Sequence, residues 1–184
     1  MLMAIQVKDD GDFKETIQRF ESLIKSCDLC HSPSRKAKVL HNLAFEYYRR
    51  KDYEPANFYY KESMLLKDNE SSPYLLSLEG YIRSAYYGSL LPKDELLELT
   101  NQGLGKAQKN NEQLYINLFT LLRHLIENKE QEYHQYLSDY SLPLFKKFGF
   151  VYLIKRSEKE LFNYCFKQKK TRRALKMAHI LINQ

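Results

Sequence analysis

One helix-turn-helix repeat of 34 residues, from Ala37 to Glu70, constrains the fold more than any other feature of this chain. Apolar residues recur at the three- and four-residue spacing of a helix face on both sides of a short turn, Lys51-Asp52-Tyr53. One such pair of helices cannot bury its apolar face alone, so the pattern predicts that several pairs stack. The residues expected at the packed positions are Leu40, Leu43, Ala44, Tyr47, Ala56 and Tyr60.

This spacing is the tetratricopeptide pattern. It predicts an all-α, tetratricopeptide-like right-handed superhelix (α-solenoid) of stacked antiparallel helix pairs, in which small Ala44 and Ala56 allow two helices to approach closely and Tyr60 fills the groove between them. The first helix of each pair is expected to line the inner wall of the array. Such a wall is typical of proteins that bind a peptide or another protein.

Glycine, proline and polar breaks divide the rest of the chain into further helix pairs. The turn over residues 10–13 is expected to join two helices of a partial repeat, so the chain would begin inside a repeat, and Ser34 is a candidate cap for the next helix. Pro143 is expected to break a helix over 131–147 near Leu142, with Gly149 as its C-cap. The prediction is a single domain, 1–184, with a partial repeat at 1–31, the clean repeat at 37–70, and divergent repeats at 74–108, 113–147 and 151–183.

Composition excludes several classes of protein. No run of 18 apolar residues predicts a membrane span, and the first five residues lack the basic start and the length of a signal peptide, so we expect a cytoplasmic protein. The net charge of +6 is unevenly placed, because residues 146–176 carry eleven Lys and Arg against two Glu. The densest run, 167–173, is interpreted first as a solvated turn, with nucleic acid or an acidic partner as the alternatives.

No residue constellation predicts catalysis, a metal site or a cofactor. Cys27-Asp28-Leu29-Cys30-His31 has the spelling of a c-type haem attachment site, but it lies at a helix end with no secretion signal, so two ordinary thiols are the preferred interpretation. The histidines His41, His124, His134 and His179 lie on different predicted helices with no carboxylate or nucleophile at a pairing distance in sequence. We therefore expect that the protein is not an enzyme.

Two stretches resemble a known family. They are 37–44, Ala-Lys-Val-Leu-His-Asn-Leu-Ala, and 142–149, Leu-Pro-Leu-Phe-Lys-Lys-Phe-Gly, the second followed by Glu160-Leu161-Phe162-Asn163-Tyr164. Together they are similar to the tetratricopeptide domains of bacterial peptide-pheromone (quorum-sensing) receptors of the Rap, NprR and PlcR type, in their C-terminal portion. The resemblance implies a short signalling peptide bound in the concave groove, and an output through a separate N-terminal module.

The helix positions that face the inner wall give the candidate site. In the clean repeat, Asn42 is the leading candidate, because a carboxamide offers both a donor and an acceptor to the backbone of an extended peptide; the alternative is that it bonds within its own repeat. Arg83 and Arg123 would pair with an acidic group of the ligand, or else with Glu79 and Glu127 on their own helices. The predicted peptide-binding residues are Lys38, Asn42, Phe45, Arg49, Glu79, Arg83, Thr120 and Arg123, with His41, Tyr48, Tyr86, Phe119, Lys159 and Asn163 at equivalent inner-wall positions.

Two functions are compatible with these features. The first is a peptide-sensing regulatory domain of a quorum-sensing transcriptional regulator, for which the partner is a short signalling peptide. The second is a tetratricopeptide adaptor or dimerisation module that binds a partner protein. A homodimer is compatible with either function, whereas direct nucleic-acid binding would require a separate effector domain.

Overall fold

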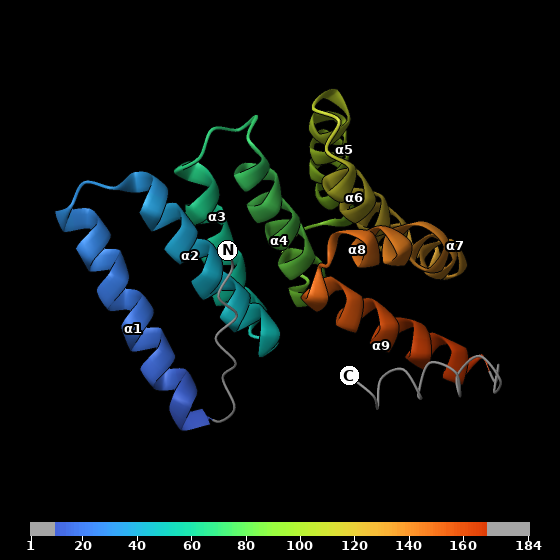
Figure 1. Ribbon diagram of the computed structural model, residues 1–184, viewed down its shortest axis with the longest axis horizontal. Coiled ribbons are helices and arrows are strands. Elements are labelled where there is room, and N and C mark those ends of the chain that lie inside the picture. The colour runs from blue at the N-terminus through green and yellow to red at the C-terminus, as the bar shows by residue number, and fades with distance from the viewer. Residues whose placement is uncertain (1–9, 169–184) are drawn as a thin grey trace. The chain divides into compact units, whose positions relative to one another are not determined.

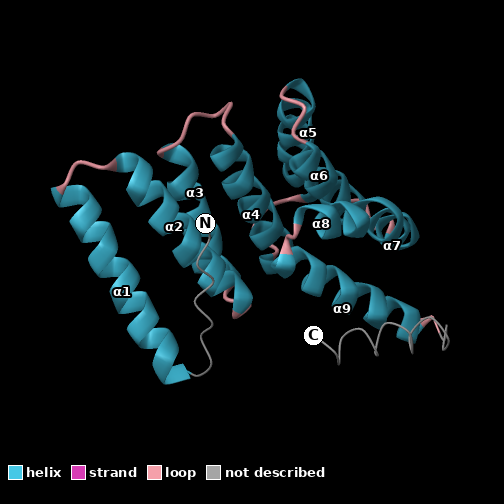
Figure 2. Ribbon diagram, in the orientation of Figure 1, coloured by secondary structure: helices cyan, strands magenta, loops and turns pink. Residues whose placement is uncertain are grey.

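The computed structural model describes residues 10–168, and every regular element in that range is a helix (Figures 1 and 2). The predicted all-α class is confirmed. None of the helices in this range is long and apolar enough to cross a membrane. The chain divides into two compact units, with the boundary between Leu96 and Leu97, and each unit is described by itself.

Between residues 10 and 96 the first unit contains four complete helices. They are α1 (Asp10–Leu29), α2 (Pro33–Arg49), α3 (Tyr53–Leu65) and α4 (Ser72–Gly88). Each helix packs on the next one in the chain, and α2 also contacts α4 (Figure 1). This alternation is the arrangement expected of stacked pairs, in which α2 and α4 are the first helices of successive repeats and α3 packs behind them.

The clean repeat folds as its sequence predicts. Its apolar stripe is buried against α3, and Lys51 takes a left-handed backbone conformation with φ 65° in the turn between the helices. Tyr47 is half-buried, and the other packed positions are at most 5% exposed: Leu40, Leu43, Ala44, Ala56 and Tyr60.

A glycine and an aromatic ring set the distance between α3 and α4. A Cβ atom placed on Gly80 would lie 2.5 Å from the ring of Tyr60, which is closer than van der Waals contact allows. The ring therefore occupies the space that a side chain at position 80 would need. Ala44, Ala56 and Tyr60 form the centre of a core cluster at this joint.

Two expectations about the N-terminal repeat are wrong. Residues 10–12 belong to α1 and do not form a turn, because a single glycine costs a helix only about 1 kcal/mol and the aspartates favour a helix N-terminus. Ser32, and not Ser34, precedes the first turn of α2, because Pro33 takes the first helical position. Ser32 makes no side-chain capping hydrogen bond there.

The second unit contains the remaining helices, and its boundary falls within the first of them. They are α5 (Lys93–Lys109), α6 (Gln113–Ile126), α7 (Glu130–Tyr136), the π-helical segment η1 (Leu137–Ser141), α8 (Leu142–Phe148) and α9 (Val151–Lys167). The most apolar segment, α6, is buried along its length, as the sequence predicts. Its fully buried residues include Leu118, Leu121, Leu122 and Ile126.

The predicted interruption around Pro143 takes the form of a π-turn. Pro143 is the second residue of α8, and η1 immediately precedes it; at the junction the Leu142 amide donates to the Leu137 carbonyl, five residues back. Gly149 ends α8 with φ 70°, which confirms it as the C-cap. The second helix predicted for the last pair, 171–183, lies outside the described residues.

The π-turn keeps one face of this segment directed at the core. Tyr133, Leu137, Ser141 and Phe145 are all buried, at steps of four residues. In a continuous α-helix each step of four overshoots a full turn, so the fourth residue would have rotated by about 120° away from the first. The wider π-turn cancels part of this drift, and η1 contacts both α6 and α9.

Candidate functional site

Four predicted site residues lie together on one face of α2. Lys38, Asn42, Phe45 and Arg49 follow one another at steps of four, three and four residues, so they share one side of the helix. Lys38 and Arg49 are exposed, whereas Asn42 and Phe45 are half-buried. We term this set the α2 face.

Asn42 is at the centre of the α2 face. Its carboxamide makes no hydrogen bond to any other residue between 10 and 168, so the alternative of a bond within its own repeat is not realised there. A half-buried carboxamide with two donors and one acceptor unused is suited to bind a peptide backbone. Phe45, one turn further along, packs against the core cluster and gives the face an apolar floor.

The C-terminal end of the α2 face carries an ion pair and a group of aromatic rings in contact. Arg49 forms an ion pair with Glu46, with Nη1 3.3 Å from each carboxylate oxygen. Burial raises the pKa of Glu46, and the Arg49 guanidinium partly offsets this. The Tyr48 ring lies 5.8 Å from the ring of Tyr53 and 6.4 Å from that of Tyr87, which joins α2, α3 and α4 by aromatic contacts.

A polar network behind the α2 face was not anticipated from the sequence. The Lys67 ammonium donates to Ser77 Oγ at 2.7 Å and to the Pro73 carbonyl at 3.0 Å, and Ser77 Oγ lies 2.9 Å from Nδ1 of His41. Ser63 Oγ donates a hydrogen bond to the Ala37 carbonyl at 2.7 Å. The sequence signal that could have indicated this network is serine at helix positions that are expected to be buried. Ser63 and Ser77 are both 0% exposed.

This network fixes the protonation of His41. Because Lys67 donates to Ser77, the Ser77 hydroxyl can donate its proton to Nδ1 of a neutral imidazole. Burial, followed by the charge on Lys67, lowers the pKa of His41 to about 3, and burial lowers the pKa of Lys67 to about 8. At neutral pH His41 is therefore uncharged, next to Asn42 in sequence.

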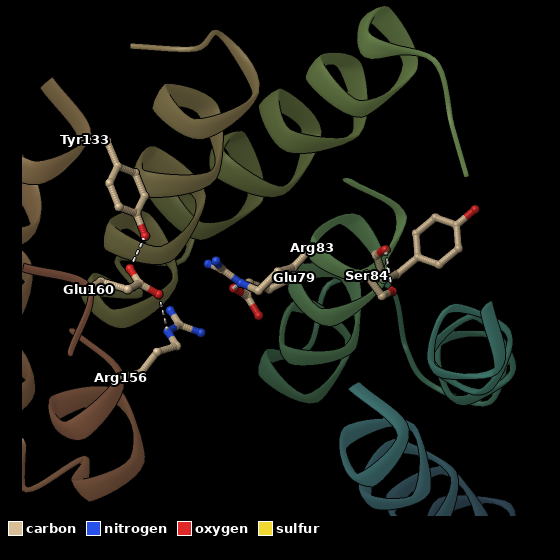
Figure 3. Close-up of polar contacts among 7 residues, drawn as sticks. Glu79, Arg83, Ser84, Tyr133, Arg156 and Glu160 are labelled. Carbon is tan, nitrogen blue, oxygen red and sulfur yellow. Dashed lines mark hydrogen bonds and ion pairs between the residues drawn. The ribbon is translucent and has the colours of Figure 1, made fainter. Parts of the chain in front are cut away.

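Glu79 and Arg83 pair with each other, which is the alternative that the sequence left open. Arg83 Nε donates to Glu79 Oε1 at 2.6 Å along α4 (Figure 3), and Arg83 is only 2% exposed. A buried, hydrogen-bonded ion pair of this kind serves the interior of the protein. We therefore leave both residues out of the α2 face.

The remaining predicted site residues belong to the second unit. Thr120 Oγ1 donates to the Ile116 carbonyl at 2.7 Å, a bond within its own helix, and Arg123 is half-buried near Glu127, whose pKa it helps to lower after Lys129. The expectation that Phe119 lines an inner wall is wrong. Phe119 is 0% exposed, and its ring occupies the space beside Gly103 on α5.

A polar link joins α7 to α9. Tyr133 Oη donates to Glu160 Oε2 at 2.6 Å, and Glu160 also lies 3.6 Å from Arg156 Nε (Figure 3). Lys159 and Asn163 are exposed on α9. Between residues 10 and 168 no group of three or more His, Cys, Asp or Glu side chains is placed to hold a metal ion, and the cysteines are free thiols.

Helix pairs that stack through alanine, glycine and a tyrosine ring define a tetratricopeptide-like fold. Among solved structures, the chain is similar to the apo form of the quorum sensor NprR from B. thuringiensis, with a TM-score of 0.73 and 19% sequence identity. The match covers 93% of this chain and 49% of the NprR chain, so the chain spans about half the length of that protein. The predicted tetratricopeptide-like fold is confirmed by this likeness. No protein-family model and no curated protein matches the sequence.

Proposed function

We propose that this chain is a peptide-binding regulatory domain of a quorum-sensing regulator, and that a short extended peptide binds along the α2 face. The observation that carries the proposal is the half-buried Asn42 carboxamide, which has no hydrogen-bond partner among residues 10–168. An extended peptide has unpaired backbone donors and acceptors that this group can satisfy. The likeness to a protein solved as a quorum sensor supports the same function.

The other side chains of the face have complementary roles in this proposal. Lys38 and Arg49 provide positive charge at the two ends of the face, about 16 Å apart along the helix axis at 1.5 Å per residue. A peptide of about five extended residues spans that distance, at about 3.3 Å per residue. Phe45 lies between them and would contact an apolar side chain of the peptide.

The test begins with selection from a pooled synthetic library of peptides of about seven residues. Peptides enriched on the wild-type chain are then titrated by calorimetry against the wild type, Asn42→Ala and the control Asn101→Ala, which removes an exposed carboxamide on α5. We expect Asn42→Ala to weaken binding about tenfold, because it removes hydrogen bonds to the peptide backbone. Equal affinity for the two variants, both with unchanged melting temperature, would remove Asn42 from the site.

Failure to enrich any peptide would favour the adaptor function. In that case the same chain would be expected to bind a folded protein and not a short segment.

A further inference from the structure

The residues of α9 divide between a buried side and an exposed side. The buried side consists of Ser157, Glu158, Leu161 and Cys165. At 3.6 residues per turn six exposed residues lie within about 120° of arc opposite to them, and Val151, at the start of the helix, is exposed outside this arc. We term this exposed set the α9 lysine face: Tyr152, Lys155, Lys159, Asn163, Phe166 and Lys167.

Positive charge on the α9 lysine face is not balanced by acidic residues of the same helix. α9 contains two acids, and both are engaged elsewhere. Glu158 is 1% exposed with its Oε1 2.7 Å from Lys146 Nζ, and Glu160 accepts the 2.6 Å hydrogen bond from Tyr133. Within residues 10–168, Lys155, Lys159 and Lys167 form no ion pair. The face therefore presents three positive charges and no negative one.

Two large aromatic side chains lie at the ends of this charged stripe. Tyr152 is 42% exposed and Phe166 is 72% exposed, and their positions are about 21 Å apart along the helix axis. Exposed rings on a solvated surface lose hydrophobic stabilisation, and aromatic residues are enriched where one protein binds another. The combination of rings and charge distinguishes this face from an ordinary solvated helix surface.

The spacing of the lysines matches an extended peptide chain. Lys155 and Lys159 are about 6 Å apart along the axis, and Lys167 is about 12 Å beyond Lys159. In an extended chain the side chains on one side recur every 6.6–6.8 Å or so. Acidic side chains on alternate residues of such a chain would therefore lie opposite these lysines, and Asn163, between them, offers hydrogen bonds to its backbone.

We propose that the α9 lysine face binds an acidic, extended segment of a partner protein, with apolar residues of that segment against Tyr152 and Phe166. The mode is electrostatic recognition with an aromatic contact at each end. Single-stranded nucleic acid fits the face less well, because stacking sites place rings along the path of the strand and here the rings lie only at its two ends.

This inference goes beyond the proposed function and is independent of it. It uses no residue of the α2 face, so the variant Asn42→Ala should leave binding at α9 unchanged. The two proposals can therefore fail separately.

The test uses the full chain and a fluorescent synthetic peptide of about ten residues, with glutamate at alternate positions and a phenylalanine near each end. The comparison peptide carries glutamine in place of each glutamate. By fluorescence anisotropy at low salt we expect the acidic peptide to bind and the glutamine peptide to bind at least tenfold more weakly. Affinity for the acidic peptide should fall as the salt concentration rises.

Matched triple variants then locate the site. The variant with Lys155→Gln, Lys159→Gln and Lys167→Gln should lose at least tenfold in affinity for the acidic peptide. The control, with Lys14→Gln, Lys25→Gln and Lys61→Gln, makes the same change in net charge at exposed positions on α1 and α3 and should keep wild-type affinity. Circular dichroism verifies that both variants remain helical.

Three results would overturn the proposal. One is an equal loss of affinity in the two triple variants, which would show an effect of net charge alone. Another is the absence of binding to the acidic peptide by the wild-type chain. The third is tighter binding of an oligothymidylate than of the acidic peptide, with that binding lost in the α9 variant, which would assign the face to nucleic acid.

Discussion

Lys67 and Ser77 form a 2.7 Å hydrogen bond between the loop after α3 and the body of α4, and this contact holds a charged ammonium beside a neutral imidazole. Lys67 Nζ and His41 Nδ1 both contact the hydroxyl group of Ser77, so a proton on His41 would place a second positive charge in a poorly solvated region. At pH 7 this region therefore carries one positive charge, on Lys67, while His41 stays neutral.

The first prediction concerns the pH dependence of stability. The folded chain lowers the pKa of His41 from 6.5 to about 3, so between these values the unfolded chain binds more protons and the free energy of unfolding falls as the pH falls. Burial lowers the pKa of Lys67 from 10.5 to about 8, so between these values the unfolded chain again binds more protons. The free energy of unfolding therefore rises as the pH rises from 8 to 10.5. Urea unfolding measured at intervals between pH 4 and 10 should show both changes, on either side of a plateau near pH 7.

His41→Gln isolates the acidic part of that curve. Glutamine has no titratable group, and its carboxamide can still accept a hydrogen bond from Ser77. The wild type should lose up to about 3 kcal/mol more than the variant between pH 7 and pH 4. Parallel unfolding curves for the two proteins would show that His41 does not titrate differently in the folded and unfolded chains.

A second prediction uses two glycines in helices. Gly80→Ala places a methyl group 2.5 Å from the Tyr60 ring and should destabilise the chain by about 1–3 kcal/mol through overpacking. Gly105→Ala meets no atom within 4 Å and should stabilise it by about 0.5–1 kcal/mol through helix propensity alone. Thermal unfolding of both variants checks the pair. A joint between α3 and α4 that is looser than described would give the two changes the same sign.

The third prediction concerns the link between α7 and α9. Tyr133→Phe removes the hydroxyl that donates to Glu160 and should cost about 1–2 kcal/mol, since hydrogen bonds to a charged group are stronger than neutral ones. Tyr140→Phe removes a hydroxyl from a side chain that is 63% exposed and should have almost no effect. The difference in the free energy of unfolding is obtained from denaturant midpoints, provided that the unfolding curves have equal m-values. Similar losses of stability in both variants would argue against a specific role for the Glu160 contact.

The fourth prediction concerns the buried ion pair of α4. Arg83→Met alone leaves the Glu79 carboxylate without its close partner and should destabilise the chain by about 3 kcal/mol or more. The double variant Glu79→Leu with Arg83→Met removes both charges and should recover much of that loss. A double-mutant cycle from urea unfolding measures the coupling. Additive losses would mean that the pair makes no net interaction.

The regular parts of the fold were predictable because apolar periodicity alone determines them. The face of α2 that carries Asn42 follows from the stripe of Leu40, Leu43 and Tyr47 on the other side of the same helix. Residues in a regular helix keep their angular relationship wherever the helix lies. That is why four site residues predicted from position alone share one face in the structure.

The sequence left one point open and placed one residue wrongly, and the packing of neighbouring helices decides both. A pair spaced by four residues, such as Glu79 and Arg83, forms the same contact whether it points inward or outward, so its burial cannot be read from spacing. Phe119 was placed in the wrong direction because the space that accepts its ring is created by Gly103 on another helix. The network of His41, Ser63, Lys67 and Ser77 brings together groups that are far apart in sequence.

The π-turn at η1 has a consequence for how sequences of this type should be aligned. Its wider turn holds one residue more than the α-helical path across the same segment would need. A homologous chain that lacks that residue would turn every side chain of α8 by about 100° relative to α6, and would have to rebuild the contacts of Ser141 and Phe145. A one-position gap within 137–141 is therefore a marker of altered geometry, and an alignment that closes it compares residues that occupy different places in space.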